Sequence, residues 1–152
     1  MKRHSLFRVA CAVFLLHASG ANAATENTLD LHAYQGKVVY VDFWASWCGP
    51  CRESFPWLRQ VDARYQDKGL VVVGVNLDHD RQLADDFLKF YRPGFLIVFD
   101  EAARLADEFH VKGMPASFLI DRNGKVRYQH IGFRMTQHRE YEQEVEALLA
   151  EP

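Results

Sequence analysis

Cysteine is scarce in this 152-residue chain, which contains only Cys11, Cys48 and Cys51. A basic excess is also missing, because 18 Lys and Arg against 20 Asp and Glu give a formal net charge of −2. The chain therefore lacks the positively charged footprint of a nucleic-acid-binding protein. No internal repeat or low-complexity tract follows residue 24. With 49% hydrophobic and 25% charged residues, the composition is that of one soluble globular domain.

The first 23 residues differ from the rest. Three basic residues fall among the first eight, no acid precedes Glu26, and residues 9–16 form an apolar run. That run is far shorter than the roughly 20 residues that span a bilayer. Ala21-Asn22-Ala23 matches the small-x-small pattern of a signal peptidase site. We therefore expect a cleavable signal peptide at residues 1–23 and one domain at residues 24–152. The alternatives are an uncleaved membrane anchor and lipidation of Cys11.

Removal of residues 1–23 would change the residues available for function. It would leave 15 basic against 20 acidic residues, a net charge of −5, and would take away Cys11. Only Cys48 and Cys51 would remain as thiols. The remaining 129 residues are enough for a hydrophobic core without a disulfide staple. A bridge between residues three apart also removes little unfolded-state entropy. Stapling is therefore a weak explanation for the cysteine pair.

Hydrophobic runs and helix breakers predict the element order β-α-β-α-β-α-β-β-α. The expected strands are residues 38–44, 70–77, 95–99, 116–120 and 125–131, and the expected helices are 50–67, 80–91, 101–109 and 136–151. The first two strands show little polar alternation, which is typical of buried strands. Asn123-Gly124 predicts a hairpin between the last two strands. The order indicates an α/β fold with parallel strands, helices on both faces and antiparallel strands at one edge.

Cys48 and Cys51 flank Gly49-Pro50 in the loop between the first predicted strand and its helix. This position is the carboxyl end of a sheet strand, where open α/β sheets place their sites. It is also a helix N-terminus, which stabilises an anion such as a thiolate and so lowers the pKa of Cys48. Cys51 lies one turn into the helix. We expect Cys48 to attack a disulfide and the more buried Cys51 to resolve the mixed disulfide.

Other roles for the two thiols fit the sequence less well. A structural zinc site needs four ligands, whereas the mature chain has no third cysteine and its five histidines are scattered. Copper carriage would need a histidine beside the two thiols. Peroxidase chemistry would need a proline shortly before the reactive cysteine, and residues 43–47 contain none. We expect no metal site and no cofactor.

Residues 41–52, with the sequence VDFWASWCGPCR, resemble the active-site segment of thioredoxins. Residues 70–109 resemble the extra strand and helix of the secreted TlpA/ResA-like branch. Residues 113–121, GMPASFLID, resemble the cis-proline segment of that branch. The resemblance runs from Leu31 to the C-terminus. It implies a thioredoxin-like central mixed sheet, with helices on both faces and a βα insert before the cis-proline strand.

The resemblance also assigns roles around the cysteines. It implies a redox-active Cys48–Cys51 disulfide, and a cis bond before Pro115 that brings this proline beside Cys48. The backbone of Met114 would bind an extended substrate peptide by strand addition. Trp47 would flank the thiol as an apolar contact surface or simply pack there half-exposed. Gly49 and Pro50 complete the predicted substrate-binding residues.

Asp42 is the polar residue of the first predicted strand. The resemblance places it behind Cys51, where it would accept the proton of that thiol. An isolated buried carboxylate has a raised pKa, which suits a proton acceptor near neutral pH. Thioredoxin pairs this acid with a lysine on the next strand, and the matching position here is Gly74. The alternative is an ordinary, partly exposed strand acid.

The combined features predict a periplasmic thiol-disulfide oxidoreductase that reduces protein disulfides. Gly-Pro between the cysteines belongs to the reducing end of the redox scale, where thioredoxin lies near about −270 mV. Its partners would be protein disulfide substrates and a membrane electron donor that re-reduces it. An uncleaved signal would anchor it in the inner membrane facing the periplasm. The alternatives are a cytochrome c maturation thioredoxin, a disulfide oxidase or isomerase, and a copper chaperone or similar metal-binding module.

Overall fold

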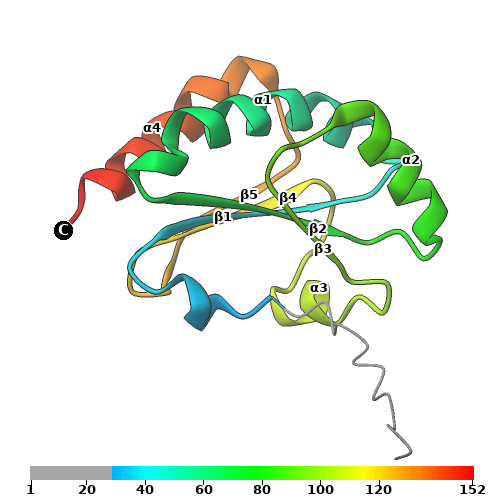
Figure 1. Cartoon of the computed structure of the whole chain (residues 1–152), viewed down its shortest axis with the longest axis horizontal. Helices are drawn as coiled ribbons and strands as arrows, with labels where there is room; N and C mark the ends of the chain where they lie inside the picture. Colours follow the sequence, from blue (N-terminus) through cyan, green and yellow to red (C-terminus); the bar gives the residue numbers. More distant parts are fainter. Residues whose placement is uncertain (1–28) are drawn as a thin grey trace, which may run out of the picture.

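The computed structural model describes residues 29–152 and contains one mixed five-stranded sheet (Figure 1). The strand order is β3-β2-β1-β4-β5. The strands are β1 (Val38–Trp44), β2 (Leu70–Asn76), β3 (Leu96–Phe99), β4 (Ala116–Ile120) and β5 (Val126–Ile131). Strands β1, β2 and β3 run parallel, whereas β4 pairs antiparallel with both β1 and β5. Strand β1 therefore lies at the centre, which explains why every residue in it is buried.

Helices cover both faces of the sheet, as Figure 1 shows. Helices α1 (Gly49–Tyr65), α2 (Arg81–Tyr91) and α4 (His138–Ala150) lie on one face, and the short α3 (Arg104–Glu108) lies on the other. Single 3₁₀ turns occur at η1 (Leu31–Tyr34), η2 (Gln66–Lys68) and η3 (Met135–Gln137). The central strands carry apolar side chains on both faces of the sheet. Both faces must therefore be covered by helices, which gives three layers.

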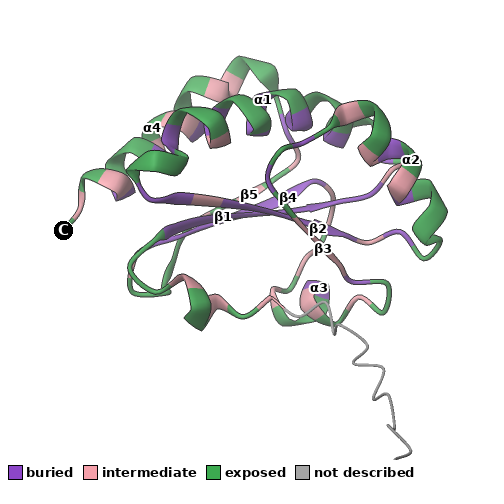
Figure 2. Ribbon diagram, in the orientation of Figure 1, coloured by how far each residue is buried: buried purple, intermediate pink, exposed green. Residues whose placement is uncertain are grey.

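The two faces of β1 enter different hydrophobic clusters because successive strand residues point to opposite sides. Val39, Val41 and Phe43 belong to the cluster under α3. Tyr40 and Trp44 belong to the cluster under α1, α2 and α4. Figure 2 shows this as a buried sheet between helices whose outer sides are exposed.

The predicted α/β order and the hairpin edge are confirmed, but two helices begin later than expected. The helix predicted at residues 101–109 spans only Arg104–Glu108. Asp100 accepts hydrogen bonds from the backbone N–H groups of Arg104 and Ala106, and Ala103 has a left-handed backbone (φ 54°). The preceding residues therefore form a turn. The last helix begins at His138, because residues 135–137 form the 3₁₀ turn η3.

The predicted signal peptide at residues 1–23, including Cys11, lies outside the described residues. Within residues 29–152, no helix has both the length and the apolar character to cross a bilayer.

Candidate active site

The two cysteines lie where β1 passes into α1. After Trp44 the chain turns, and the N–H of Cys48 donates to the carbonyl of Ala45 at 3.1 Å. Cys48 is the N-cap of α1, and its Sγ accepts from the N–H of Cys51 at 3.3 Å. Pro50 lies in the first turn of the helix, where its missing N–H leaves no hydrogen bond unmade. The sequence therefore places Cys48 Sγ at a helix N-terminus, as predicted.

Cys48 and Cys51 form a disulfide. Cys51 is completely buried, and Cys48 is 5% exposed, so the difference in burial has the predicted direction. Both belong to the aromatic-rich cluster under α1. Trp47, immediately before Cys48, is 64% exposed, which places a large apolar surface beside the disulfide. Gly49 has open space around its Cα, with no atom within 4 Å of an added Cβ.

Asp42 is buried on the same face of β1 as Tyr40 and Trp44, and therefore on the cysteine side of the sheet. Its Oδ2 has no hydrogen-bond partner among the described residues. Burial raises the pKa of Asp42 well above the usual aspartate value. The partly exposed alternative is therefore wrong, and the predicted raised pKa follows from desolvation alone.

Residue 74, where thioredoxin has a lysine, is a glycine in this chain and lies beside Asp42. Asp42 pairs in register with Gly74 on β2. A Cβ at Gly74 would lie 3.0 Å from Ile97 Cδ1, 3.1 Å from Trp44 Nε1 and 3.2 Å from Phe95 Cε2. The indole of Trp44 thus occupies the space that a longer side chain at residue 74 would need.

On its other side, Asp42 pairs in register with Ser117 on β4. The hydroxyl of Tyr40 donates to Ser117 Oγ at 3.0 Å. Burial raises the pKa of Tyr40 well above the usual tyrosine value, with the nearby Asp42 as a second cause. The hydrogen bond between Tyr40 and Ser117 joins β1 to β4 beside Asp42.

The Met114–Pro115 peptide bond is cis, as the resemblance implies. The carbonyl of Pro115 accepts from the N–H of Gly132 at 2.7 Å. Ala116, the next residue, pairs with Phe43 near the end of β1. Met114 packs against the buried cluster that contains both cysteines. The register therefore brings the cis-proline segment to the end of β1 from which the Cys48 loop begins.

Asp78 is a site residue that sequence reasoning missed. Its sequence neighbours are typical of a polar strand-to-helix loop, and Asp80 is the N-cap of α2, accepting from the N–H of Gln82. Asp78 is instead buried. Its carboxylate accepts from the N–H of Ser46 at 2.9 Å, from Ser46 Oγ at 2.8 Å and from Asn76 Nδ2 at 2.7 Å. It therefore holds the loop that precedes Trp47 and Cys48 against the end of β2.

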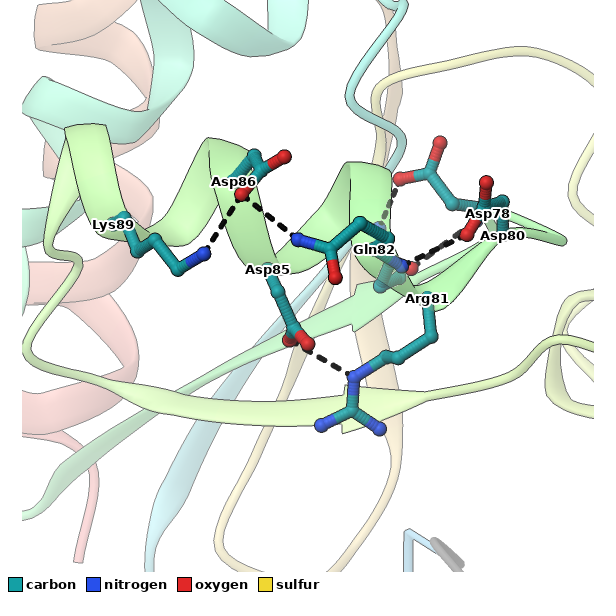
Figure 3. A network of polar contacts seen from close by, with 8 residues as sticks. Asp78, Asp80, Arg81, Gln82, Asp85, Asp86 and Lys89 are labelled. Atoms are coloured by element: carbon teal, nitrogen blue, oxygen red, sulfur yellow. Dashed lines mark hydrogen bonds and ion pairs between the residues drawn. The ribbon is translucent and has the colours of Figure 1, made fainter.

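Asp78 and Asp80 lie close together at the start of α2 (Figure 3). Among residues 29–152, no three His, Cys, Asp or Glu side chains gather closely enough to hold a metal ion. The three hydrogen bonds that the Asp78 carboxylate accepts offset the cost of burying it. Sequence spacing could not reveal this role, because the loop that it holds is 32 residues away along the chain.

Comparison with known proteins identifies the family. The Redoxin family model matches residues 17–149. The chain belongs to the Redoxin family. Within the thioredoxin superfamily it lies on the ResA-like branch, as the cysteine and cis-proline segments predicted. It is 31% identical over 104 residues to the thiol-disulfide oxidoreductase ResA of Bacillus cereus. That alignment covers 68% of this chain and 60% of the ResA chain, so the match spans less than two thirds of the relative's length.

Solved structures of other proteins share the fold of this chain. A Chlorobium tepidum protein assigned provisionally as the thiol:disulfide interchange protein DsbE is 51% identical, with a TM-score of 0.77. The match covers 79% of this chain and 85% of that one. StoA of Bacillus subtilis is 28% identical, with a TM-score of 0.63, over 72% of this chain and 82% of its own. These neighbours confirm the predicted thioredoxin-like arrangement.

Proposed function

We propose that this Redoxin-family protein reduces protein disulfides by dithiol–disulfide exchange. The observation that carries the proposal is the Cys48–Cys51 disulfide at the N-terminus of α1, beside the exposed Trp47. The names of the ResA and DsbE relatives support the same chemistry. Both cysteines are held by one strand–helix junction, so the pair can close and open without rearranging the sheet.

The reaction starts from the dithiol form. The thiolate of Cys48 attacks one sulfur of the substrate disulfide and forms a mixed disulfide, while the second substrate sulfur leaves as a thiolate and takes up a proton. Cys51 then loses its proton and attacks Cys48 Sγ. This step releases the first substrate sulfur as a thiolate and forms the Cys48–Cys51 disulfide. Two electrons pass from the protein to the substrate.

Two features of the site assist these steps. The N–H of Cys51 and the N-terminus of α1 stabilise negative charge on Cys48 Sγ. Asp42 lies buried on the same side of the sheet as Cys51, and burial raises its pKa. Its carboxylate would accept the proton of Cys51 during resolution. Trp47, Met114, Pro115, Gly49 and Pro50 would form the surface over which the substrate peptide lies.

We further propose that the protein acts as a reductant in the periplasm. Gly49-Pro50 between the cysteines favours a potential near that of thioredoxin, about −270 mV, over that of the strong periplasmic oxidant, about −120 mV. A reductant in an oxidising compartment needs a membrane protein that passes electrons to it. The predicted signal peptide supports this location.

Equilibration with a glutathione redox buffer tests the direction of electron flow. We expect a potential below about −200 mV, and a value above about −180 mV would refute the reductase proposal. Trapping tests the roles of the two thiols. Cys51→Ser should accumulate a mixed disulfide between Cys48 and the substrate, visible on a non-reducing gel. The matched Cys48→Ser variant should accumulate none, and equal trapping by both variants would contradict the assignment of Cys48 as nucleophile.

A further inference from the structure

An apolar groove of about 590 Å³ lies between the loop that precedes Cys48 and helix α2. Its lining includes five apolar or aromatic side chains and one cation: Trp47, Leu83, Phe87, Phe90, Tyr91 and Arg52. Three of them are strongly exposed, since Phe90 is 79%, Trp47 64% and Leu83 50% accessible. Contiguous exposed apolar patches larger than a few hundred Å² are rare on monomeric proteins and mark sites that contact another molecule.

The groove follows from the way α2 packs on the sheet. Leu83, Phe87 and Phe90 recur at i, i+4 and i+7 and therefore share one stripe of the helix. Phe87 points into the core, where its ring stacks on Tyr91 at 4.2 Å and lies 4.7 Å from Trp44. Leu83 and Phe90 stay exposed on the same stripe. The floor of the groove is thus fixed by the aromatic core, and its rim faces solvent.

The charged side chains of α2 engage one another instead of covering this stripe. Arg81 Nε lies 3.0 Å from Asp85, while Gln82 and Lys89 both donate to Asp86 (Figure 3). These contacts join residues three or four apart on the exposed part of the helix. The apolar stripe is therefore left available for a partner.

We infer that the groove receives apolar residues that flank the reactive cysteine of a protein disulfide substrate. This inference rests on the proposed reductase function. In the mixed disulfide, the partner's Cα lies within about 7 Å of the Cα of Cys48. Trp47, which we place in the substrate surface, also borders the groove, so a partner chain that covers Trp47 can continue into it. Because cysteine is among the most buried residue types, it is usually surrounded by apolar side chains in a folded protein, and an incompletely folded substrate exposes those side chains together with its disulfide.

Arg52, the cation that lines the groove, indicates which charge a bound segment should carry. Arg52 is exposed and donates from Nη2 to the carbonyl of Ser46 at 3.1 Å. A guanidinium carries five N–H donors, so others remain for a ligand. The groove therefore fits an extended, incompletely folded segment with a large apolar residue close to its cysteine, and favours a carboxylate beside it. Oxidised glutathione is built only from Glu, Cys and Gly residues, so it has no large apolar side chain to place in the groove.

The test compares a protein substrate with a small one, using purified protein and dithiothreitol as the electron source. In the Leu83→Ser/Phe90→Ser double variant, kcat/KM for insulin should fall about tenfold, as loss of two apolar contacts predicts. The rate with glutathione disulfide should not change. Val126→Ser removes from β5 an apolar side chain about as exposed as Leu83 (46% against 50%), and should leave both rates unchanged. The single Phe90→Ser variant gives the same comparison if the double variant does not fold.

The outcomes separate this inference from the proposed function. An unchanged insulin rate in a folded Phe90 variant overturns the docking inference while leaving the reductase proposal intact. A wild-type protein that reduces neither substrate overturns both. An equal loss with both substrates also overturns the inference, because the groove would then serve the chemistry itself. A variant that differs from wild type only in sedimentation does so too, because the groove would then serve self-association.

Discussion

Gly74→Ala tests whether the space facing Asp42 is filled. The added Cβ would lie 3.0 to 3.2 Å from atoms of Ile97, Trp44 and Phe95, closer than the usual contact of about 3.5 Å. Trp44 cannot move away easily, because it is fully buried and its ring lies 4.7 Å from those of both Phe55 and Phe87.

Overpacking of a tight core costs about 2 kcal/mol. The lower entropy of the unfolded alanine chain returns about 0.5 kcal/mol. The free energy of unfolding should therefore fall by about 1.5 kcal/mol relative to wild type.

Urea denaturation of the oxidised protein measures this change. With a slope of about 1.5 kcal/mol per molar urea, the midpoint should fall by about 1 M. Gly49→Ala is the matched control, because nothing lies within 4 Å of its added Cβ. We expect that control to be neutral or stabilised by up to about 1 kcal/mol. A Gly74→Ala protein within about 0.5 kcal/mol of wild type would refute the steric reasoning, since that is the scatter of innocuous surface changes.

Two further predictions concern the buried acids. Burial raises the pKa of Asp42 in the folded state. Its contribution to the free energy of unfolding is therefore complete below the unfolded-state pKa of about 3.9, and is lost as pH rises through the folded-state pKa. Asp42→Asn should therefore gain stability relative to wild type as pH rises from about 4 towards 8, in urea melts at each pH; a difference that does not vary with pH would contradict the raised pKa. Asp78→Ala removes the acceptor of three hydrogen bonds, so it should lower the free energy of unfolding by about 3 kcal/mol and slow insulin reduction. The control Asp80→Ala removes an exposed N-cap and should lower it by only about 1 kcal/mol. Equal losses in the two variants would show that Asp78 does not hold the loop.

Local sequence signals predicted much of the fold and the centre of the site. The buried run at residues 38–44, followed by a cysteine and Pro50, locates a strand, a helix N-terminus and Cys48 between them. These features depend on neighbouring residues, so their spacing is visible in the sequence. The hairpin from β4 to β5 was predicted for the same reason. Its loop contains Gly124 in the left-handed conformation, and the Asp121 carboxylate accepts from the N–H groups of Asn123 and Lys125.

Features that depend on contacts between distant segments could not be predicted in this way. The role of Asp78 requires the end of β2 to meet the loop after β1, and its sequence neighbours suggest only a polar turn. The sequence also could not predict that Leu83 and Phe90 are exposed to solvent. The apolar periodicity of α2 predicts a core-facing stripe, but not how much of that stripe the sheet covers.

The absence of a cation opposite Asp42 changes how this acid would work. A lysine on the neighbouring strand would stabilise the carboxylate and lower its pKa, which opposes the effect of burial. Here Gly74 occupies that position, and the neutral ring of Trp44 lies over it. The proton affinity of Asp42 is therefore raised by desolvation alone. A carboxylate of higher pKa is a stronger proton acceptor for Cys51, but a smaller fraction of it is ionised at a given pH. Resolution of the mixed disulfide should then accelerate as pH rises through the pKa of Asp42, and Asp42→Asn should abolish that dependence.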